Sequence, residues 1–300
     1  MFQRYSQSAI TILLALCLAS SIKADDGANA PNFVIFYVDD LGWADTSVRM
    51  MDGEPLSASD FYRTPALERL AERGMRFSSG YAPTPTCTRS RISIQFGQTS
   101  ARLQYRNVFD VLAKKQRPSG WDDEVSMAGV LKAAEKGYVT AHFGKGMGVR
   151  RMDHAGYDVT DEFDKGPNGN GHGSYIDVKC KVPIPDDNPK RIGDLTRRSV
   201  NFVREHAGER PFFLMVSHYA VHVPHAARLG LIEKYRKLPR GKYLRDADYL
   251  PVGEIPKGMK ISSWRLQYAA MLEEVDEGLG VIVDALGRAG ELEDTLIIFT

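Results

Sequence analysis

Three segments of this chain are apolar at nearly every position, and this pattern restricts the fold more than any other feature. They are rich in Val, Ile, Leu and Phe, and they lie at residues 32–38, 212–216 and 295–299. A strand with apolar side chains on both faces is buried on both faces, which is typical of parallel sheets covered by helices. Two further strands are predicted at residues 75–77 (Met-Arg-Phe) and 138–143.

Segments with helical spacing of their apolar residues lie between these strands. Thr64, followed by a proline, predicts the start of a helix that ends at Gly74. Further helices are expected at residues 126–137, 194–206 and 263 to about 289, and a long surface loop is expected at residues 164–188. This alternation predicts an α/β fold with a mostly parallel sheet flanked by helices. Ligands in such folds bind beyond the carboxyl ends of the strands.

The first 24 residues have the pattern of a secretory signal peptide. Arg4 precedes an apolar run at residues 9–19, and Ala24 ends a suitable cleavage site. The run is too short for a membrane-spanning anchor, and no other stretch of the sequence approaches that length. We therefore expect residues 1–24 to be removed and residues 25–300 to form one α/β domain. The mature protein is expected to be secreted or periplasmic, without membrane association after cleavage.

Positive and negative charges nearly balance in this sequence. There are 39 Lys and Arg residues against 38 Asp and Glu residues, which gives a net charge of +1. Binding to nucleic acid or to an anionic membrane through the overall field of the protein needs a strong excess of positive charge. Nucleic acid is therefore not an expected partner, and a charged substrate has to be held by local side chains.

Two cysteines, Cys87 and Cys180, remain after cleavage of the signal peptide. One interpretation is a disulfide between them, because the compartment is oxidising. The other starts from Arg91, which follows Cys87 by four residues in an expected helix, so that both side chains share a face. A nucleophile at position 87 would then have a cation beside it. These residues alone leave both interpretations open.

Polar residues that could bind a metal or an anion follow two of the expected strands. Asp39 and Asp40 come directly after the first strand. They either belong to a turn or hold a hard divalent cation, which prefers oxygen ligands. Lys145 comes after the strand at residues 138–143 and can bind an anion. The spacing of the neighbouring glycines excludes a phosphate-binding P-loop.

Three histidines follow the strand at residues 212–216, namely His218, His222 and His225. Pro224 and the β-branched residues oppose a helix here. In an extended chain His218 and His222 lie roughly 13 Å apart, which is too far for one zinc ion. His222 alone could donate a proton or bind an anion, and a purely structural role is the alternative.

Six segments, taken in this order, resemble the sulfatase family of the alkaline-phosphatase superfamily. They are NFVIFYVDDLG (32–42), TPALERLA (64–71), CTRSR (87–91), GYVTAHFGK (137–145), YAVHVP (219–224) and the stretch 268–300. The resemblance runs from about residue 31 to residue 300. It implies the family's α/β fold, of which this chain would hold the amino-terminal part without the carboxyl-terminal one.

The resemblance implies hydrolysis of sulfate esters, either of carbohydrates or of aryl compounds. In this family the cysteine that matches Cys87 is oxidised by a formylglycine-generating enzyme. The hydrated aldehyde then attacks sulfur and forms a covalent sulfate ester. By position, Asp39, Asp40 and residue 87 would bind calcium, with magnesium as the alternative ion.

Three further residues take roles from the same resemblance. Arg91 would support the formylglycine, while Lys145 and His222 would bind sulfate oxygens or the leaving group. In this interpretation the six candidate residues come from four separate segments of the sequence.

The chain departs from the family pattern at three places. Arg89 replaces the proline of the Cys-x-Pro-x-Arg modification signal, and Met147 replaces the histidine of a Gly-Lys-Trp-His motif. The family's second pair of metal ligands follows the strand that matches residues 295–299, where this sequence stops. A catalytically impaired sulfatase-like protein is therefore the alternative to an active sulfatase. A third interpretation, a phosphate-ester hydrolase with Thr86 or Thr88 as nucleophile, lacks identifiable ligands for its two zinc ions.

Overall fold

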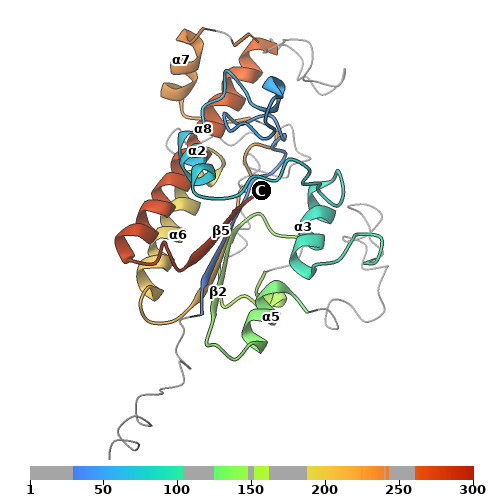
Figure 1. Cartoon of the computed structure of the whole chain (residues 1–300), viewed down its shortest axis with the longest axis vertical. Coiled ribbons are helices and arrows are strands. Elements are labelled where there is room, and N and C mark those ends of the chain that lie inside the picture. The colour runs from blue at the N-terminus through green and yellow to red at the C-terminus, as the bar shows by residue number, and fades with distance from the viewer. Residues whose placement is uncertain are drawn as a thin grey trace, which may run out of the picture.

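The computed structural model describes residues 30–103, 125–147, 152–161, 188–223, 225–239, 241–242 and 261–300 (Figure 1). The strands are β1 (Asn32–Tyr37), β2 (Val139–Gly144), β3 (Val159–Thr160), β4 (Phe212–Ser217) and β5 (Thr295–Phe299). The α-helices are α2 (Pro65–Glu72), α3 (Cys87–Phe96), α5 (Met127–Ala133), α6 (Ile192–His206), α7 (Leu229–Lys237) and α8 (Ile261–Ala289). Short 3-10 helices lie at Pro55–Ser57, Met152–Ala155 and Pro189–Arg191.

The five strands form one parallel sheet in the order β3-β2-β4-β1-β5. This confirms the predicted α/β fold with a parallel sheet. β4 lies in the middle, and every one of its residues is buried, as its continuous apolar sequence requires. The register places Tyr37, Ser217 and Gly144 in one row across β1, β4 and β2. The loops that follow these three strands therefore leave the sheet at the same edge.

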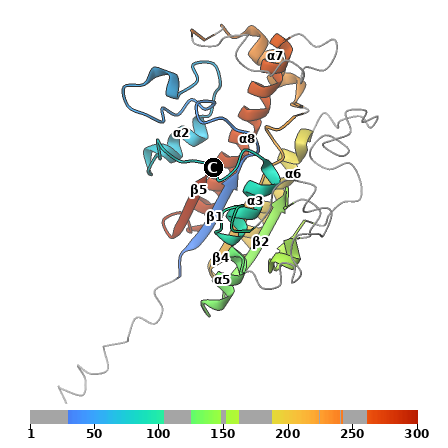
Figure 2. The ribbon, with the colours of Figure 1, turned by 90° about the vertical axis from the view of Figure 1, so that its right-hand side faces the viewer.

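Helices cover both faces of the sheet (Figures 1 and 2). On one face α2, α6 and α8 pack against side chains such as Val34, Phe36 and Val216, and together they form the larger hydrophobic core. On the other face α3 and α5 pack against Ile35 and Met215 in a second core. Alternate residues of each strand face the two cores, as the two-residue period of a strand requires.

α2 and α5 begin where predicted and α6 and α8 begin two residues earlier, but the groups that cap α2 and α5 differ. Ser126 caps α5 as expected, since its hydroxyl accepts a hydrogen bond from the Gly129 backbone N–H over 3.0 Å. Thr64 precedes α2, yet its hydroxyl bonds to Ser47 and makes no capping bond. The carboxylate of Asp276, in α8, instead accepts the backbone N–H groups of Ala66 and Leu67, both over 2.8 Å. The cap of α2 is therefore a tertiary contact.

The strand expected at residues 75–77 is wrong, because this segment has no regular structure. Met75 and Phe77 are 78% and 67% exposed, so no neighbouring strand or helix covers them. A short alternation of apolar residues does not show whether a pairing partner exists. The helix α7 and the short strand β3 were not expected. The signal peptide and all but Asn188 of the expected loop at 164–188 lie outside the described residues.

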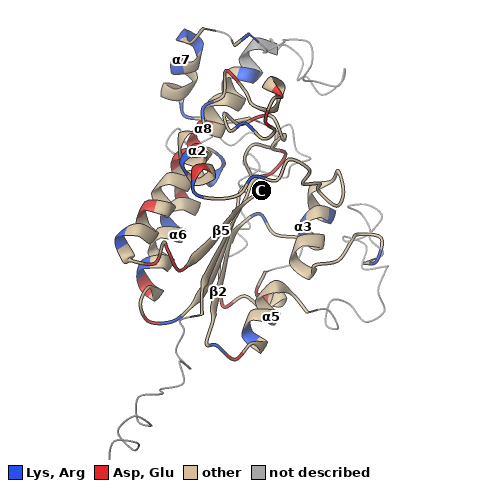
Figure 3. Ribbon diagram, in the orientation of Figure 1, with Lys and Arg blue, Asp and Glu red and all other residues tan. Residues whose placement is uncertain are grey.

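The described strands contain no Lys, Arg, Asp or Glu, and residues of both signs are distributed along the helices and loops (Figure 3). This distribution agrees with the near-zero net charge. None of the described helices is both long enough and apolar enough to cross a bilayer.

β5 lies at one edge of the described sheet and carries exposed apolar side chains. Leu296 and Ile298, on the face that α3 and α5 cover elsewhere, are 52% and 42% exposed. They line a groove of about 1650 Å³ together with Met75, Phe77 and Tyr81. An exposed apolar edge strand is a site of self-association.

We predict that Ile298→Lys increases the monomeric fraction of this chain, because a charge on the exposed face of an edge strand opposes pairing between copies. Size-exclusion chromatography with light scattering over a concentration series measures the effect. Val281→Lys is the control, since Val281 is 44% exposed on α8 and away from the strand edge. Equal self-association of both variants and the wild type would contradict the prediction.

Asp276→Ala is predicted to lower the free energy of unfolding by about 2–4 kcal/mol, because two buried N–H groups at the start of α2 lose a charged acceptor. Chemical denaturation followed by circular dichroism measures this loss. Asp284→Ala, an exposed change in the same helix, should leave the stability within about 0.5 kcal/mol. A stability loss that is equal in the two variants would argue against Asp276 as the cap of α2.

Candidate active site

Asp39 lies at the end of β1 with its carboxylate between two cations. Its Oδ1 lies 3.2 Å from an Arg91 guanidinium nitrogen, and its Oδ2 accepts a hydrogen bond from the Lys145 ammonium group. The side chain is 4% exposed. Burial by itself raises the pKa of Asp39, but Arg91 and Lys145 together hold that pKa below its ordinary value. Asp39 is therefore ionised and fixed in place.

Arg91 connects α3 to the ends of three strands. It is 2% exposed. Its guanidinium donates to the backbone oxygens of Lys145 (2.9 Å) and His218 (3.1 Å) and to the Ser217 hydroxyl. The guanidinium also lies over the ring of Tyr37, 4.8 Å from its centroid. These contacts fix the start of α3, and thereby residue 87, against the edge of the sheet.

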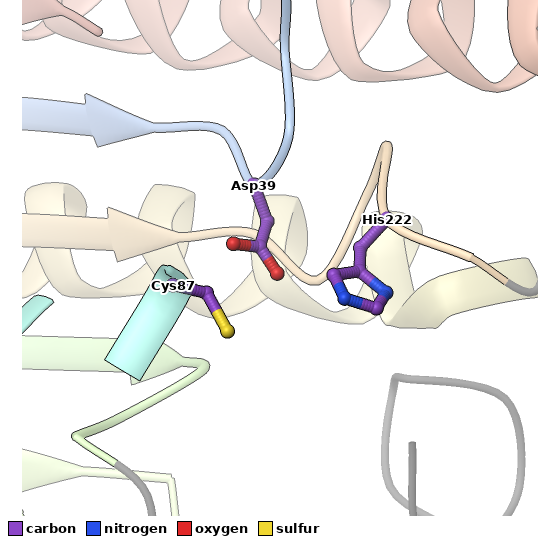
Figure 4. Close-up of side chains that lie close together, drawn as sticks. All are labelled: Asp39, Cys87 and His222. Carbon is purple, nitrogen blue, oxygen red and sulfur yellow. The ribbon is translucent and has the colours of Figure 1, made fainter. Parts of the chain in front are cut away.

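Cys87 is the first residue of α3 and has a free thiol. Cys180, the partner in the alternative interpretation of a disulfide, lies outside the described residues, so that alternative is not tested. The Cys87 sulfur, an Asp39 oxygen and a His222 ring nitrogen all lie within 4.8 Å of one another (Figure 4). The backbone N–H groups at the start of α3 favour an anion beside position 87.

The position of Lys145 depends on the glycine before it. Gly144 has φ +103°, and a Cβ there would lie 2.0 Å from the Ser217 carbonyl oxygen. Only glycine lets the backbone pass this close, and the Lys145 N–H then donates to that same oxygen over 2.7 Å. Lys145 therefore leaves β2 directed toward Asp39.

His222 and Asp40 form a second pair beside Asp39. The His222 Nε2 lies 3.4 Å from an Asp40 carboxylate oxygen, and its Nδ1 lies 2.5 Å from the Val223 carbonyl oxygen. Burial, followed by the charge of Lys145, lowers the pKa of His222, while burial raises the pKa of Asp40. Because a carbonyl oxygen only accepts, Nδ1 carries a proton. The contact between Nε2 and Asp40 is then favourable only with a further proton between them.

The structure brings together all six residues predicted from the sequence, listed here with their elements: Asp39 and Asp40 after β1, Cys87 and Arg91 in α3, Lys145 after β2, and His222 after β4. Their catalytic and metal-binding roles stay predictions. His218 is not among the three clustered residues Asp39, Cys87 and His222. It is fully buried and its ring lies against Phe36.

Two further residues at this site were missed by the sequence analysis. Ser217 is fully buried and hydrogen-bonds to both Arg91 and Lys145. Lys190 is 1% exposed and precedes α6 with φ +55°. Burial and the charge of Lys145 lower the pKa of Lys190 to about 7, while Asp39 and Asp40 act in the opposite direction. Neither residue lies in a recognisable motif, so no local signal could have found them.

The two substituted motif positions have ordinary structural contacts. Arg89 donates from its Nε to the Thr86 hydroxyl over 2.7 Å. Met147 is 2% exposed and packs in the core beneath α3 and α5. Thr88, which with Thr86 was the alternative hydroxyl nucleophile, is buried.

Comparison with known families shows where this chain belongs. The family model described as Sulfatase matches residues 31–300. The chain belongs to the sulfatase family. It is 28% identical to arylsulfatase A of Homo sapiens over 96% of this chain and 54% of that protein. It is 28% identical to N-acetylgalactosamine-6-sulfatase of Mus musculus over 96% of this chain and 53% of that protein. This sulfatase chain thus spans about half the length of these curated relatives.

Solved structures agree with this fold. The PsFucS1 sulfatase from Pseudoalteromonas sp. matches 99% of this chain and 58% of its own, with a TM-score of 0.62 and 23% identity. Ps i-CgsB, solved in complex with k-i-k-neocarrahexaose, matches 90% of this chain and 58% of its own, with a TM-score of 0.62 and 20% identity. The expected sulfatase fold is confirmed.

We predict that this sulfatase chain loses stability in mild acid because of two buried histidines. Burial, with repulsion from Arg91, lowers the pKa values of His142 and His218 to about 3. In the unfolded chain both titrate near pH 6.5, so only the unfolded state takes up these protons as the pH falls from about 6.5 toward 3. Each histidine therefore removes about 2 kcal/mol of stability between pH 7 and pH 5.

Urea denaturation at pH 7 and pH 5 tests this prediction. In His218→Leu the loss of unfolding free energy between the two pH values should be smaller by about 2 kcal/mol than in the wild type. His154→Leu is the control, because the His154 side chain is 67% exposed. An unchanged pH dependence in His218→Leu would refute the assignment.

Proposed function

We propose that this chain hydrolyses sulfate esters at the site around Asp39. The observation that carries the proposal is the placement of Asp39 between Arg91 and Lys145, with residue 87 and His222 within 4.8 Å of it. A nucleophile position, two cations and a proton-bearing pair then face one point. This is the set of groups that transfer of an anionic sulfuryl group needs.

Lys145 and Arg91 have different roles because their side chains differ in exposure. The Lys145 side chain is 12% exposed, whereas that of Arg91 is 3% exposed and bonded to backbone oxygens. Lys145 therefore binds a sulfate oxygen, and Arg91 holds residue 87 and Asp39 in position. The first turn of α3 adds backbone N–H groups that favour the negative charge.

His222 supplies the proton for the leaving group. The proton on Nε2, which faces the Asp40 carboxylate over 3.4 Å, is the mobile one, because Nδ1–H is held by the Val223 carbonyl. The departing alkoxide or phenoxide takes this proton as its bond to sulfur breaks. The second hydroxyl of the modified residue 87 then loses its proton and re-forms the aldehyde as the C–O bond to sulfate breaks, which releases sulfate. Addition of water to this aldehyde restores the nucleophile for the next cycle.

Whether the site fits calcium depends on the donor atom of residue 87, which differs between the thiol and the formylglycine form. With the thiol in place, Asp39, Cys87 and His222 offer oxygen, sulfur and nitrogen, a set that suits zinc better than calcium. Conversion of Cys87 to formylglycine replaces sulfur by oxygen. Residues 39, 40 and 87 then offer the oxygen ligands that calcium or magnesium prefers. A bound divalent cation would polarise the sulfate group and the nucleophile.

The substrate class and the cellular location are part of the same proposal. One structural neighbour was solved in complex with k-i-k-neocarrahexaose, and another is described with D-glucosamine-2-N,6-O-disulfate as its substrate. We infer a sulfated carbohydrate or a small aryl sulfate as substrate. The apolar run at residues 9–19 supports export by a signal peptide, with maturation by a formylglycine-generating enzyme.

The test expresses this chain together with a formylglycine-generating enzyme and measures hydrolysis of an aryl sulfate and of sulfated oligosaccharides. Cys87→Ala is expected to lower kcat/KM by on the order of 10³-fold or more, because the nucleophile is removed. Intact mass of the same samples reports the state of residue 87 and the cleavage point of the signal peptide. Full activity in Cys87→Ala would overturn the formylglycine mechanism.

Arg89→Pro restores the proline of the family's Cys-x-Pro-x-Arg modification signal and is therefore the gain-of-function variant of this test. In α3 the first helical hydrogen bond is donated by Ser90, so the Arg89 N–H is not needed and proline is tolerated. The variant is expected to increase the converted fraction of Cys87 and the activity in parallel. If neither the wild type nor Arg89→Pro is converted or hydrolyses any ester, the chain is a non-catalytic member of its family.

A further inference from the structure

The ends of β2 and β4 are joined by a reciprocal pair of hydrogen bonds at the candidate site. The Lys145 N–H donates to the Ser217 carbonyl oxygen over 2.7 Å. In return, the Ser217 hydroxyl donates to the Lys145 carbonyl oxygen over 2.6 Å. Gly144 makes this approach possible, because any side chain there would collide with the Ser217 backbone.

The same hydroxyl also accepts a hydrogen bond from Arg91. One guanidinium nitrogen of Arg91 donates both to the Ser217 hydroxyl and to the Lys145 carbonyl oxygen. The other nitrogen donates to the His218 carbonyl oxygen and contacts Asp39. The hydroxyl of Ser217 therefore lies between the two residues whose cations share the Asp39 carboxylate.

We propose that Ser217 is a positioning residue of the sulfate-ester site, which holds Arg91 and Lys145 in the arrangement in which both contact Asp39. This inference rests on the proposed function for its catalytic consequence, while the positioning itself is a property of the folded chain. Ser217 touches neither residue 87 nor any substrate position in the contacts described, so it acts through Arg91 and Lys145.

The chemistry of the position favours serine over similar residues. Ser217 has no exposed surface, so water has no path to replace a lost hydroxyl. Alanine would leave the buried guanidinium of Arg91 with one acceptor fewer, and cysteine would keep the size with a much weaker hydrogen bond. Threonine would keep the hydroxyl and add a methyl group to a closely packed site.

Loss of the Ser217 hydroxyl should affect catalysis, because the charged groups of Lys145 and Arg91 have to be positioned precisely. Lys145 and Arg91 stabilise an anionic reaction centre only if they keep their distances to it, and a displacement of about 1 Å can lower a rate by about 10²-fold. Loss of the Ser217 hydroxyl is therefore expected to reduce kcat/KM by about 10- to 100-fold without unfolding the chain.

The experiment compares Ser217→Ala with Ser199→Ala in the full chain. Ser199 is the matched control, because it is equally buried and its hydroxyl donates to the Leu195 carbonyl oxygen in α6 over 2.8 Å. Thermal melts measure stability, and hydrolysis of an aryl sulfate measures kcat/KM. The side-chain NMR signals of Arg91 report on its hydrogen bonds independently of activity.

The proposal predicts that Ser217→Ala keeps a cooperative melt and loses kcat/KM, and that its Arg91 guanidinium signals merge as the group begins to rotate. Ser199→Ala should change none of these. Unchanged Arg91 signals in Ser217→Ala would overturn the inference, as would a loss of activity no larger than that of Ser199→Ala.

A second variant distinguishes a failure of the inference from a failure to fold. The NMR signals distinguish it from a failure of the proposed function. If Ser217→Ala does not fold, Ser217→Cys replaces it, because it preserves the size of the side chain and weakens the same bonds. If the wild type hydrolyses no sulfate ester, the proposed function fails, while the Arg91 signals still decide whether Ser217 positions that residue.

Discussion

The buried carboxylate of Asp39 is the interaction on which the rest of this site depends. A carboxylate with so little exposure is costly unless cations compensate it, and here Arg91 and Lys145 each take one of its oxygens. To bring these cations together, α3 packs on the sheet through Arg91, and β2 ends in a glycine whose backbone passes over Ser217. The fold and the charge arrangement therefore require one another.

The charges around Asp39 also explain why this site suits an anion. Among the described residues, Asp39 and Asp40 carry negative charge, whereas Arg91, Lys145 and Lys190 are basic. A divalent cation bound at the acidic pair would leave a strong excess of positive charge in a buried place. Under the proposed function, this excess would attract sulfate and its monoesters, because low dielectric surroundings strengthen each interaction.

Much of the fold could be predicted from the sequence because its signals are local. A strand buried on both faces is apolar at nearly every position, as β1 and β4 are, whereas β5 is equally apolar but exposed at Leu296 and Ile298. Residues 75–77 show the alternation of apolar and polar side chains that suits a strand, yet they form none, because strand formation depends on a pairing partner that this pattern does not reveal. Thr64 likewise precedes a helix as predicted, while the capping groups come from Asp276, more than two hundred residues away.

The sequence by itself determined the residue types of the site and the edge of the sheet at which they lie. Asp39, Lys145 and His222 each follow a strand, and parallel strands place their carboxyl ends together. Only the tertiary structure decided which of these side chains touch and that Ser217 lies between Arg91 and Lys145. The physical reason is that spacing along a chain encodes the geometry of one helix or strand. The contacts of the buried Ser217 hydroxyl depend instead on how three separate elements pack against one another. The spacing of residues along the chain does not encode that packing.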